Sequence, residues 1–182
     1  NKTGKKINIV AISAKNINKK RKFKINKKIF YKNPLKIISQ KKIDILFELI
    51  GQSDGISKKI VEQSLKKKIH VITANKSLIS KHGEYLSLLA EKNKVNLEFE
   101  ASVAGGIPIL RTIKDGLATN KIKKVVGILN GTSNYILTEM QKSNKNFYDV
   151  LKKAQLLGYA ESNPKFDLNG NDVVSKIKIL SS

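Results

Sequence analysis

Three short apolar stretches decide the fold: Ile43–Ile50 (IDILFELI), Ile69–Thr73 (IHVIT) and Val95–Glu100 (VNLEFE). The first is almost continuously apolar, which is typical of a strand covered on both faces of a parallel sheet. The last alternates apolar and polar residues and predicts a strand with one face in water. Between them, apolar residues recur at helical spacing over Ile56–Leu65 and Leu78–Ala90. Repeated strand–helix–strand units predict an α/β fold with a doubly wound parallel sheet.

The residues before this region predict one more strand and a basic connection. Lys6–Ser13 (KINIVAIS) is apolar and predicts a buried strand, whereas Lys15–Lys28 is polar and rich in lysine. Asn33-Pro34 marks a turn, and Leu35–Gln40 predicts a short helix. Open parallel sheets that bind dinucleotides normally begin with a strand that ends in Gly-x-Gly-x-x-Gly. Gly4 stands alone here, so we expect a fragment that lacks this turn.

After Glu100 the pattern changes and predicts a second domain. Ala101–Pro108 (ASVAGGIP) is a tight turn, and Pro108 suits the first turn of a helix that runs to Leu117. We therefore expect an α/β domain at residues 1–103 and an α+β domain at residues 104–182. The remaining predicted elements are a strand at Ile122–Leu129, helices around Tyr135–Met140 and at Phe147–Leu157, a polar loop at Tyr159–Gly170, and a last helix at Asn171–Ser182.

The charge of the chain favours a polyanionic partner at first sight. Its 182 residues include 36 Lys and Arg against 14 Asp and Glu, so the formal net charge is +22. Only Arg21 and Arg111 are arginines, however, and no basic stretch alternates with aromatic rings that could stack on bases. We interpret the charge as a lysine-rich surface and expect no specific nucleic-acid partner. A basic polyanion-binding protein remains the alternative interpretation.

The composition also excludes several kinds of site. There is no cysteine, which excludes disulfides, thiolate metal sites and a cysteine nucleophile, and two histidines make a His-rich metal site a poor hypothesis. No apolar run approaches the ~20 residues that cross a bilayer, and no signal-peptide core opens the chain. We expect a cytoplasmic protein with no membrane partner.

Charged residues that could carry chemistry gather near the C-terminal end. Glu161 and Asp167 lie in a long loop with little periodicity, and such loops in compact domains are usually functional. Asp172 and Lys176 are four residues apart on a predicted helix and share a face. One interpretation is an ordinary surface ion pair. The other is a lysine held among acids, able to donate a proton to a carbonyl oxygen during a reduction.

Two further candidates follow predicted strands. Ala74-Asn75-Lys76 lies at the carboxyl edge of the predicted sheet, where folds of this class bind ligands, although Asn75 also suits a helix N-cap. Glu100 ends a strand and leads into a Gly-rich turn, Ser102–Ile107. Carbonyl oxygens exposed by such a turn suit a hard cation, yet most turns of this kind only reverse the chain.

Four motifs stand out when the chain is taken as a whole. They are VITANKSL (Val71–Leu78), FEASVAGGIP (Phe99–Pro108), ILNGTSNYIL (Ile128–Leu137) and the run Gln155–Lys176 with its GYAE, FDLNG and Asp-x-x-x-Lys elements. Taken together, they resemble the homoserine dehydrogenase family, because their order and spacing match that family from about Ile43 to the end of the chain.

The resemblance implies both a fold and a reaction. The fold would be a truncated Rossmann-like, NAD(P)-binding domain followed by a C-terminally truncated catalytic domain. The reaction would be the NAD(P)-dependent interconversion of L-homoserine and L-aspartate 4-semialdehyde, in threonine and methionine biosynthesis. We expect the full-length parent to be active, as a homodimer formed through its substrate domain, and the present chain alone to be inactive. Another NAD(P) dehydrogenase of amino-acid metabolism is the remaining alternative.

The resemblance implies substrate-site roles for five residues. Lys176 would be the catalytic proton donor. Glu161, Asp172 and Asp167 would hold the substrate through its α-ammonium group. Lys76 would lie near both the nicotinamide and the substrate.

The resemblance also implies a cofactor site and a cation site. Lys76, Ser53 and Gly158 would contact the cofactor. Lys15 would lie at the ribose-binding edge, and a basic residue there, with no acid beside it, favours NADP over NAD. The monovalent cation, usually assigned as sodium, would be bound by Glu100 and the backbone carbonyls of Val103, Gly105 and Ile107.

Overall fold

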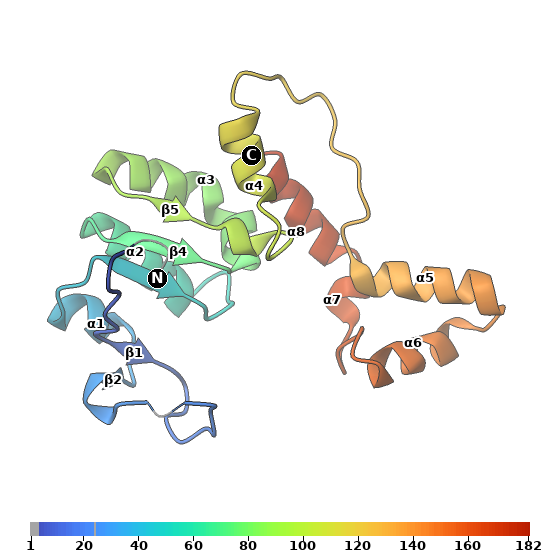
Figure 1. The fold of residues 1–182 in the computed structure, drawn as a ribbon, viewed down its shortest axis with the longest axis horizontal. Coiled ribbons are helices and arrows are strands. Elements are labelled where there is room, and N and C mark those ends of the chain that lie inside the picture. Colours follow the sequence, from blue (N-terminus) through green and yellow to red (C-terminus); the bar gives the residue numbers. More distant parts are fainter. Residues whose placement is uncertain (1–3, 24) are drawn as a thin grey trace. The chain divides into compact units, whose positions relative to one another are not determined.

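The computed structural model describes residues 4–23 and 25–182 (Figure 1). Residues 1–3 and Lys24, which belong to the predicted first domain, lie outside the described residues. The chain forms two compact units, of which the first ends at Ser102 and the second comprises Val103–Ser182.

A parallel three-stranded sheet forms the centre of the first unit (Figure 1). Its strands are β3 (Ile45–Glu48), β4 (His70–Thr73) and β5 (Leu97–Glu98), in the order β3-β4-β5. The crossovers are α2 (Ile56–Lys66) and α3 (Lys76–Asn93). The α/β fold with a parallel sheet is therefore confirmed.

The helices of this unit bury the apolar faces that their spacing predicts. α2 packs against α3 and against both β3 and β4, and α1 (Leu35–Gln40) packs against α2. Leu65 on α2 and Leu86 on α3 are fully buried. Burial of this apolar surface holds the crossovers on the sheet.

Two predictions about the strands of the first unit are wrong. Ile45 and Phe47 are 50% and 57% exposed, so β3 is buried on one face only. Of the predicted strand Lys6–Ser13, only β1 (Ile12–Ser13) forms, paired in parallel with β2 (Phe30–Tyr31) after the short 3-10 helix η1 (Lys27–Ile29). Apolar character marks a β-rich stretch, but a strand forms only where another strand accepts its backbone hydrogen bonds.

The second unit consists of helices in its described part. A 3-10 turn, η2 (Glu100–Ser102), leads into it from the first unit. The helices are α4 (Ile109–Arg111), continued by the π-helical turn η3 (Thr112–Gly116), then α5 (Gly131–Ser143), α6 (Phe147–Leu156), α7 (Lys165–Leu168) and α8 (Asn171–Leu180). α7 lies inside the stretch predicted as a polar loop.

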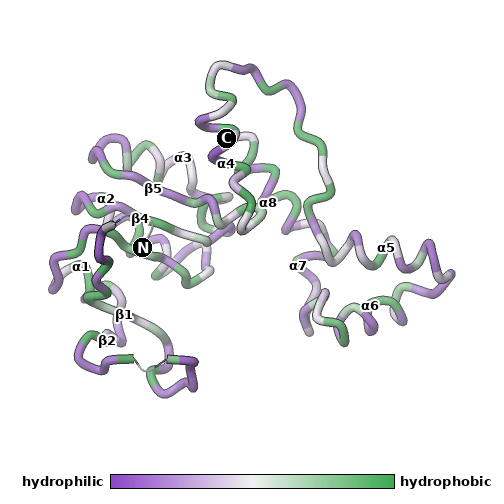
Figure 2. Tube along the Cα trace, in the orientation of Figure 1, coloured by the Kyte–Doolittle hydropathy of each residue, from purple (hydrophilic) through white to green (hydrophobic). Residues whose placement is uncertain are grey.

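The predicted strand Ile122–Leu129 is also wrong. The segment has no regular secondary structure, and Val126 and Ile128 are 79% and 78% exposed. Figure 2 shows hydrophobic residues along this extended segment between α4 and α5. The described part of the second unit contains no strand with which the segment Ile122–Leu129 could pair. Its apolar side chains therefore remain exposed to solvent.

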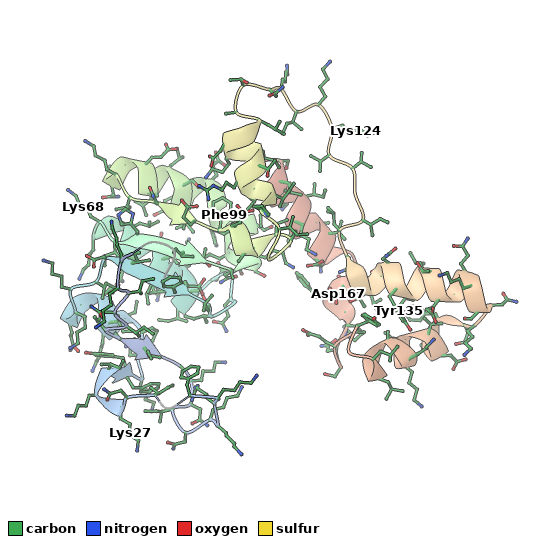
Figure 3. All side chains as sticks on the ribbon, viewed as in Figure 1. Lys27, Lys68, Phe99, Lys124, Tyr135 and Asp167 are labelled. Carbon is green, nitrogen blue, oxygen red and sulfur yellow. The ribbon has the colours of Figure 1, made fainter. Side chains whose placement is uncertain are left out.

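A small apolar core joins α5 and α6. Ile136 and Val150 are buried together in it, and Tyr135 packs against them. Tyr135, which is labelled in Figure 3, also stacks on Tyr159, with ring centroids 4.6 Å apart. Gly158, with φ 79°, allows the chain to turn after α6 as the sequence predicts.

None of the helices in the described chain combines the length and hydropathy that a bilayer crossing requires.

Candidate functional site

The carboxyl edge of the sheet carries a buried polar cluster, which we call the sheet-edge cluster: Glu48, Thr73 and Asn75. Glu48 ends β3 and Thr73 ends β4, and the two residues are register partners. The Glu48 carboxylate accepts hydrogen bonds from the Thr73 hydroxyl (2.7 Å), the Ile50 backbone N–H (2.8 Å) and the Asn75 amide (3.3 Å). A carboxylate that is 2% exposed is tolerated here because its oxygens are met by donors.

Asn75 connects this cluster to the two loops that follow the strands. Its Nδ2 donates to the Gln52 carbonyl at 2.8 Å, and its Oδ1 accepts from the Leu78 N–H at 3.1 Å as the N-cap of α3. The loop after β3 and the start of α3, where Lys76 lies, are thus held at one edge of the sheet. The prediction that the Ala74-Asn75-Lys76 segment lies at the carboxyl edge is confirmed.

Ser53, the predicted cofactor contact, lies in the loop after β3. Its hydroxyl donates to Asp54 at 2.7 Å, and Asp54 also contacts Lys81 Nζ at 2.7 Å and His82 Nε2 at 2.9 Å. These three hydrogen bonds hold the pKa of Asp54 well below its usual range, and the one from Lys81 has the largest effect, ahead of those from Ser53 and His82. Lys15, the other predicted cofactor contact of this unit, is exposed two residues after β1.

The second unit carries the acid–lysine cluster, which we define as Asn130, Thr132, Asp167, Asp172 and Lys176. Lys176 and Asp172, one turn apart on α8, form a partly buried ion pair with a distance of 2.7 Å. Lys176 Nζ also donates to the backbone carbonyl of Leu129 at 2.5 Å. The ion pair is therefore part of a buried network and differs from an ordinary surface pair.

Asn130 and Thr132 bring Asp167 into the same cluster. Asn130 Nδ2 donates to Asp167 Oδ1 at 3.0 Å and to Asp172 Oδ2 at 2.9 Å. The Thr132 hydroxyl lies 2.7 Å from the Tyr159 carbonyl and 3.3 Å from Asp167 Oδ2. The labelled Asp167 lies on α7, close to the start of α5 (Figure 3).

The structure brings together three of the residues that the sequence analysis selected for the substrate site: Asp167, Asp172 and Lys176. Glu161 differs, because it is exposed and its backbone carbonyl, rather than its carboxylate, accepts a hydrogen bond from Gln155 (3.1 Å). Gly158 lines an open hollow of about 610 Å³ beside α5 with Tyr135 and Tyr159, and Thr132 of the acid–lysine cluster lines the same hollow.

Sequence reasoning gave no role to Glu48, Asn130 or Thr132. Two signals were available: a glutamate near the end of an apolar strand, and an asparagine followed by the first turn of a helix. Neither signal predicts which side chains, distant in the sequence, the glutamate or the asparagine contacts.

The predicted cation ligands lie along one continuous segment. Glu100 begins η2, and the turn after it has positive φ at Ala104 (48°) and Gly106 (91°). The carbonyl of Ile107 accepts a hydrogen bond from the Ile109 N–H at 2.8 Å. The described residues contain no group of three or more His, Cys, Asp or Glu side chains suited to a metal ion, so a cation here would depend on carbonyl oxygens with one acid.

Comparison with known proteins first identifies the class of the N-terminal domain. Residues 1–100, which include the parallel sheet, match the family model described as "Homoserine dehydrogenase, NAD binding domain". Together with the α/β fold, this match places the first unit in the class of NAD-binding domains. Residues 108–182 match the family model "Homoserine dehydrogenase". The chain belongs to the homoserine dehydrogenase family.

Individual relatives agree with this assignment. Homoserine dehydrogenase of Neisseria gonorrhoeae is 48% identical over 153 residues, which are 84% of this chain and 35% of that protein. A crystal structure of Staphylococcus aureus homoserine dehydrogenase matches with a TM-score of 0.83 and 38% identity over 99% of this chain and 43% of that one. A hyperthermophilic archaeal homoserine dehydrogenase in complex with NADPH matches with a TM-score of 0.76 and 27% identity, over 91% of this chain and 49% of that one. The chain spans 35–40% of the length of the first two curated relatives that it matches.

Proposed function

We propose that this chain supplies the nicotinamide-binding edge and the proton-donating lysine of an enzyme that interconverts L-homoserine and L-aspartate 4-semialdehyde. The observation that carries the proposal is the acid–lysine cluster. A lysine ammonium is held by Asp172 and by the Leu129 carbonyl, and a second acid, Asp167, is tied to Asp172 through Asn130.

The cluster suits both ends of such a substrate. When the aldehyde is reduced, Lys176 Nζ donates a proton to the carbonyl oxygen as it becomes an alkoxide, and in the reverse direction it accepts that proton from the alcohol. Asp172 holds the Lys176 ammonium group in place through their ion pair, in which the two groups are 2.7 Å apart. Asp167 and Asp172, with Glu161 from the preceding loop, supply negative charge for the α-ammonium of the substrate.

The sheet-edge cluster supports a nicotinamide site at the carboxyl edge of the sheet. The cofactor supplies the hydride when it is bound. Lys76 and Ser53, which lie in the two segments that Asn75 connects, would contact it, and Lys15 would lie near the ribose. The family resemblance gives Gly158 the role of a further cofactor contact. The exposed Lys15, and the NADPH complex of the archaeal relative, favour NADP over NAD.

The proposal extends to the remaining expectations. Residues 1–103 would be the partial cofactor domain, and residues 104–182 would be part of the catalytic domain. Glu100 with the carbonyls of Val103, Gly105 and Ile107 would bind sodium. The full-length enzyme would act in the cytoplasm as a homodimer, in threonine and methionine biosynthesis.

The test replaces Lys176 by Ala in the full-length protein and measures homoserine-dependent reduction of NADP. Loss of a general acid–base group should lower kcat by about 10²–10⁴-fold, while the Kd for NADPH should stay within about twofold because Lys176 lies outside the sheet-edge cluster. Lys178→Ala, which removes an exposed lysine of the same helix, is the matched control and should leave kcat unchanged.

Two results would contradict the proposal. Unchanged turnover in Lys176→Ala would remove the assigned role of this lysine. Faster turnover of wild type with another amino-acid substrate than with homoserine would favour a different dehydrogenase. The polyanion-binding alternative instead predicts tight nucleic-acid binding that collapses with salt and survives Lys176→Ala.

A further inference from the structure

Asn130 uses its side-chain amide for three separate hydrogen bonds. Its Oδ1 accepts from the Ser133 N–H at 2.8 Å and caps the N-terminus of α5. Its Nδ2 donates to Asp167 at 3.0 Å and to Asp172 at 2.9 Å. An asparagine amide has two N–H groups, so both of its donors are committed to carboxylates, and the side chain is buried.

The two acids lie on different elements, and Asn130 donates to both of them. Asp167 lies on α7 and Asp172 on α8, and two carboxylates this close repel each other unless donors lie between them. Asn130 approaches from the start of α5 and supplies those donors without adding a charge. Asp172 Oδ2 accepts hydrogen bonds from both Asn130 and Lys176, so the Asn130 amide and the lysine ion pair share this oxygen.

We propose that Asn130 is a positioning residue that sets the affinity for the amino-acid substrate by holding the Asp167 and Asp172 carboxylates at a fixed separation. This inference rests on the proposed function. The acids would be aligned before the substrate arrives, so that its ammonium group meets two oriented carboxylates. The competing explanation is that Asn130 matters only as the N-cap of α5.

The chain contains a control for that explanation. Asn146 caps α6 in the same way, because its Oδ1 accepts from the Asp149 N–H at 3.0 Å and its Nδ2 donates to the Asp149 carboxylate at 2.8 Å. Asn146 is exposed and makes these contacts within its own helix. The same substitutions at positions 130 and 146 therefore separate capping from the bridging of the two acids.

The experiment compares Asn130→Ser, Asn130→Asp, Asn146→Ser and Asn146→Asp in the full-length protein. Ser and Asp both retain an oxygen that can cap a helix, but neither has an amide. Asn130→Ser replaces the two amide N–H donors by a single hydroxyl on a shorter side chain without adding charge. We expect the KM for homoserine to rise about tenfold, as for loss of hydrogen bonds to a charged group. Asn130→Asp adds a third carboxylate to the cluster and should raise this KM further.

The readout that separates positioning from capping is which kinetic constant changes. The KM for NADP should stay within about twofold in all four variants, and kcat should change less than the KM for homoserine in the Asn130 variants. The Asn146 variants should match wild type in all three constants. If Asn130→Asp does not fold, Asn130→Ser decides the question.

A homoserine KM within twofold of wild type in Asn130→Ser would overturn the inference, and so would an equal rise in Asn146→Ser. A wild-type protein that binds NADPH but does not oxidise homoserine would instead overturn the proposed function, and the inference about Asn130 would fall with it. The two failures are therefore distinguishable.

Discussion

Replacing Glu48 by Gln exchanges one carboxylate oxygen for an NH2 group at a buried, hydrogen-bonded position of the first unit. The carboxylate accepts from the Ile50 N–H, the Thr73 hydroxyl and the Asn75 amide, and it is almost fully buried. A glutamine keeps one acceptor oxygen and places an N–H group where the other oxygen was. If the new NH2 group lies at the Oε1 position, the Ile50 N–H and the Asn75 amide lose their acceptor, and if it lies at the Oε2 position, the Thr73 hydroxyl loses its acceptor.

The magnitude follows from the number and kind of these hydrogen bonds. A bond to a charged acceptor contributes about 1.5–3 kcal/mol and one between neutral groups about 0.5–1.5 kcal/mol. Weakening three bonds, partly offset because a buried charge is removed, gives a net loss of about 2 kcal/mol. For a chain of this length, that corresponds to a fall in Tm of about 4–8 °C.

The assay is thermal unfolding of Glu48→Gln against Glu98→Gln, which makes the same change at an exposed position on β5. The control should melt within about 1 °C of wild type, as expected of a surface substitution. Adding Thr73→Val to wild type and to Glu48→Gln tests the contact between these two side chains directly. The double mutant should lose less free energy of unfolding than the sum of the losses in the two single mutants. A Tm for Glu48→Gln that equals that of the control would refute the reasoning.

Two further predictions concern stability. Asp54 has a pKa held below its ordinary value, first by Lys81, so it favours the folded state above the ordinary aspartate pKa of about 3.9 and loses this effect as pH falls through the lowered pKa. Asp54→Asn should therefore melt below wild type at pH 7, with a difference that closes at pH values below about 4; a difference that grows in acid would contradict this. Leu65→Ala, at a fully buried site, should lower the free energy of unfolding by about 2–5 kcal/mol. Leu88→Ala, at a site 60% exposed, should cost about 0.5 kcal/mol or less, and chemical denaturation giving equal losses would show that the core is elsewhere.

The helices of the first unit were predictable because their signals are local. Ile56, Ile60, Val61 and Leu65 recur at helical spacing, and α2 spans Ile56–Lys66. The asparagine before α3 caps the helix as the sequence predicts. In each case the information lies within one or two turns of chain.

The strands were less predictable because pairing depends on distant residues. Lys6–Ser13 and Ile122–Leu129 have the composition of strands, yet one pairs over only two residues and the other has no regular structure. By contrast, Ile43–Ile50 forms β3 because β4 lies beside it, with Glu48 opposite Thr73. Apolar composition reports a tendency toward extended structure, and the partner decides whether a strand forms.

The amino-acid sequence by itself determined the class of the fold, the positions of helices such as α1, α2, α6 and α8, and the family motifs that contain Asp167, Asp172 and Lys176. Only the tertiary structure decided how these residues meet: Asn130 reaches acids 37 and 42 positions away, and Lys176 reaches the Leu129 carbonyl 47 positions away. The physical reason is the distance along the chain over which each effect acts. Periodicity and capping depend on residues that are close in sequence. The partners of a buried amide depend on how separate helices pack, because that packing brings distant residues together.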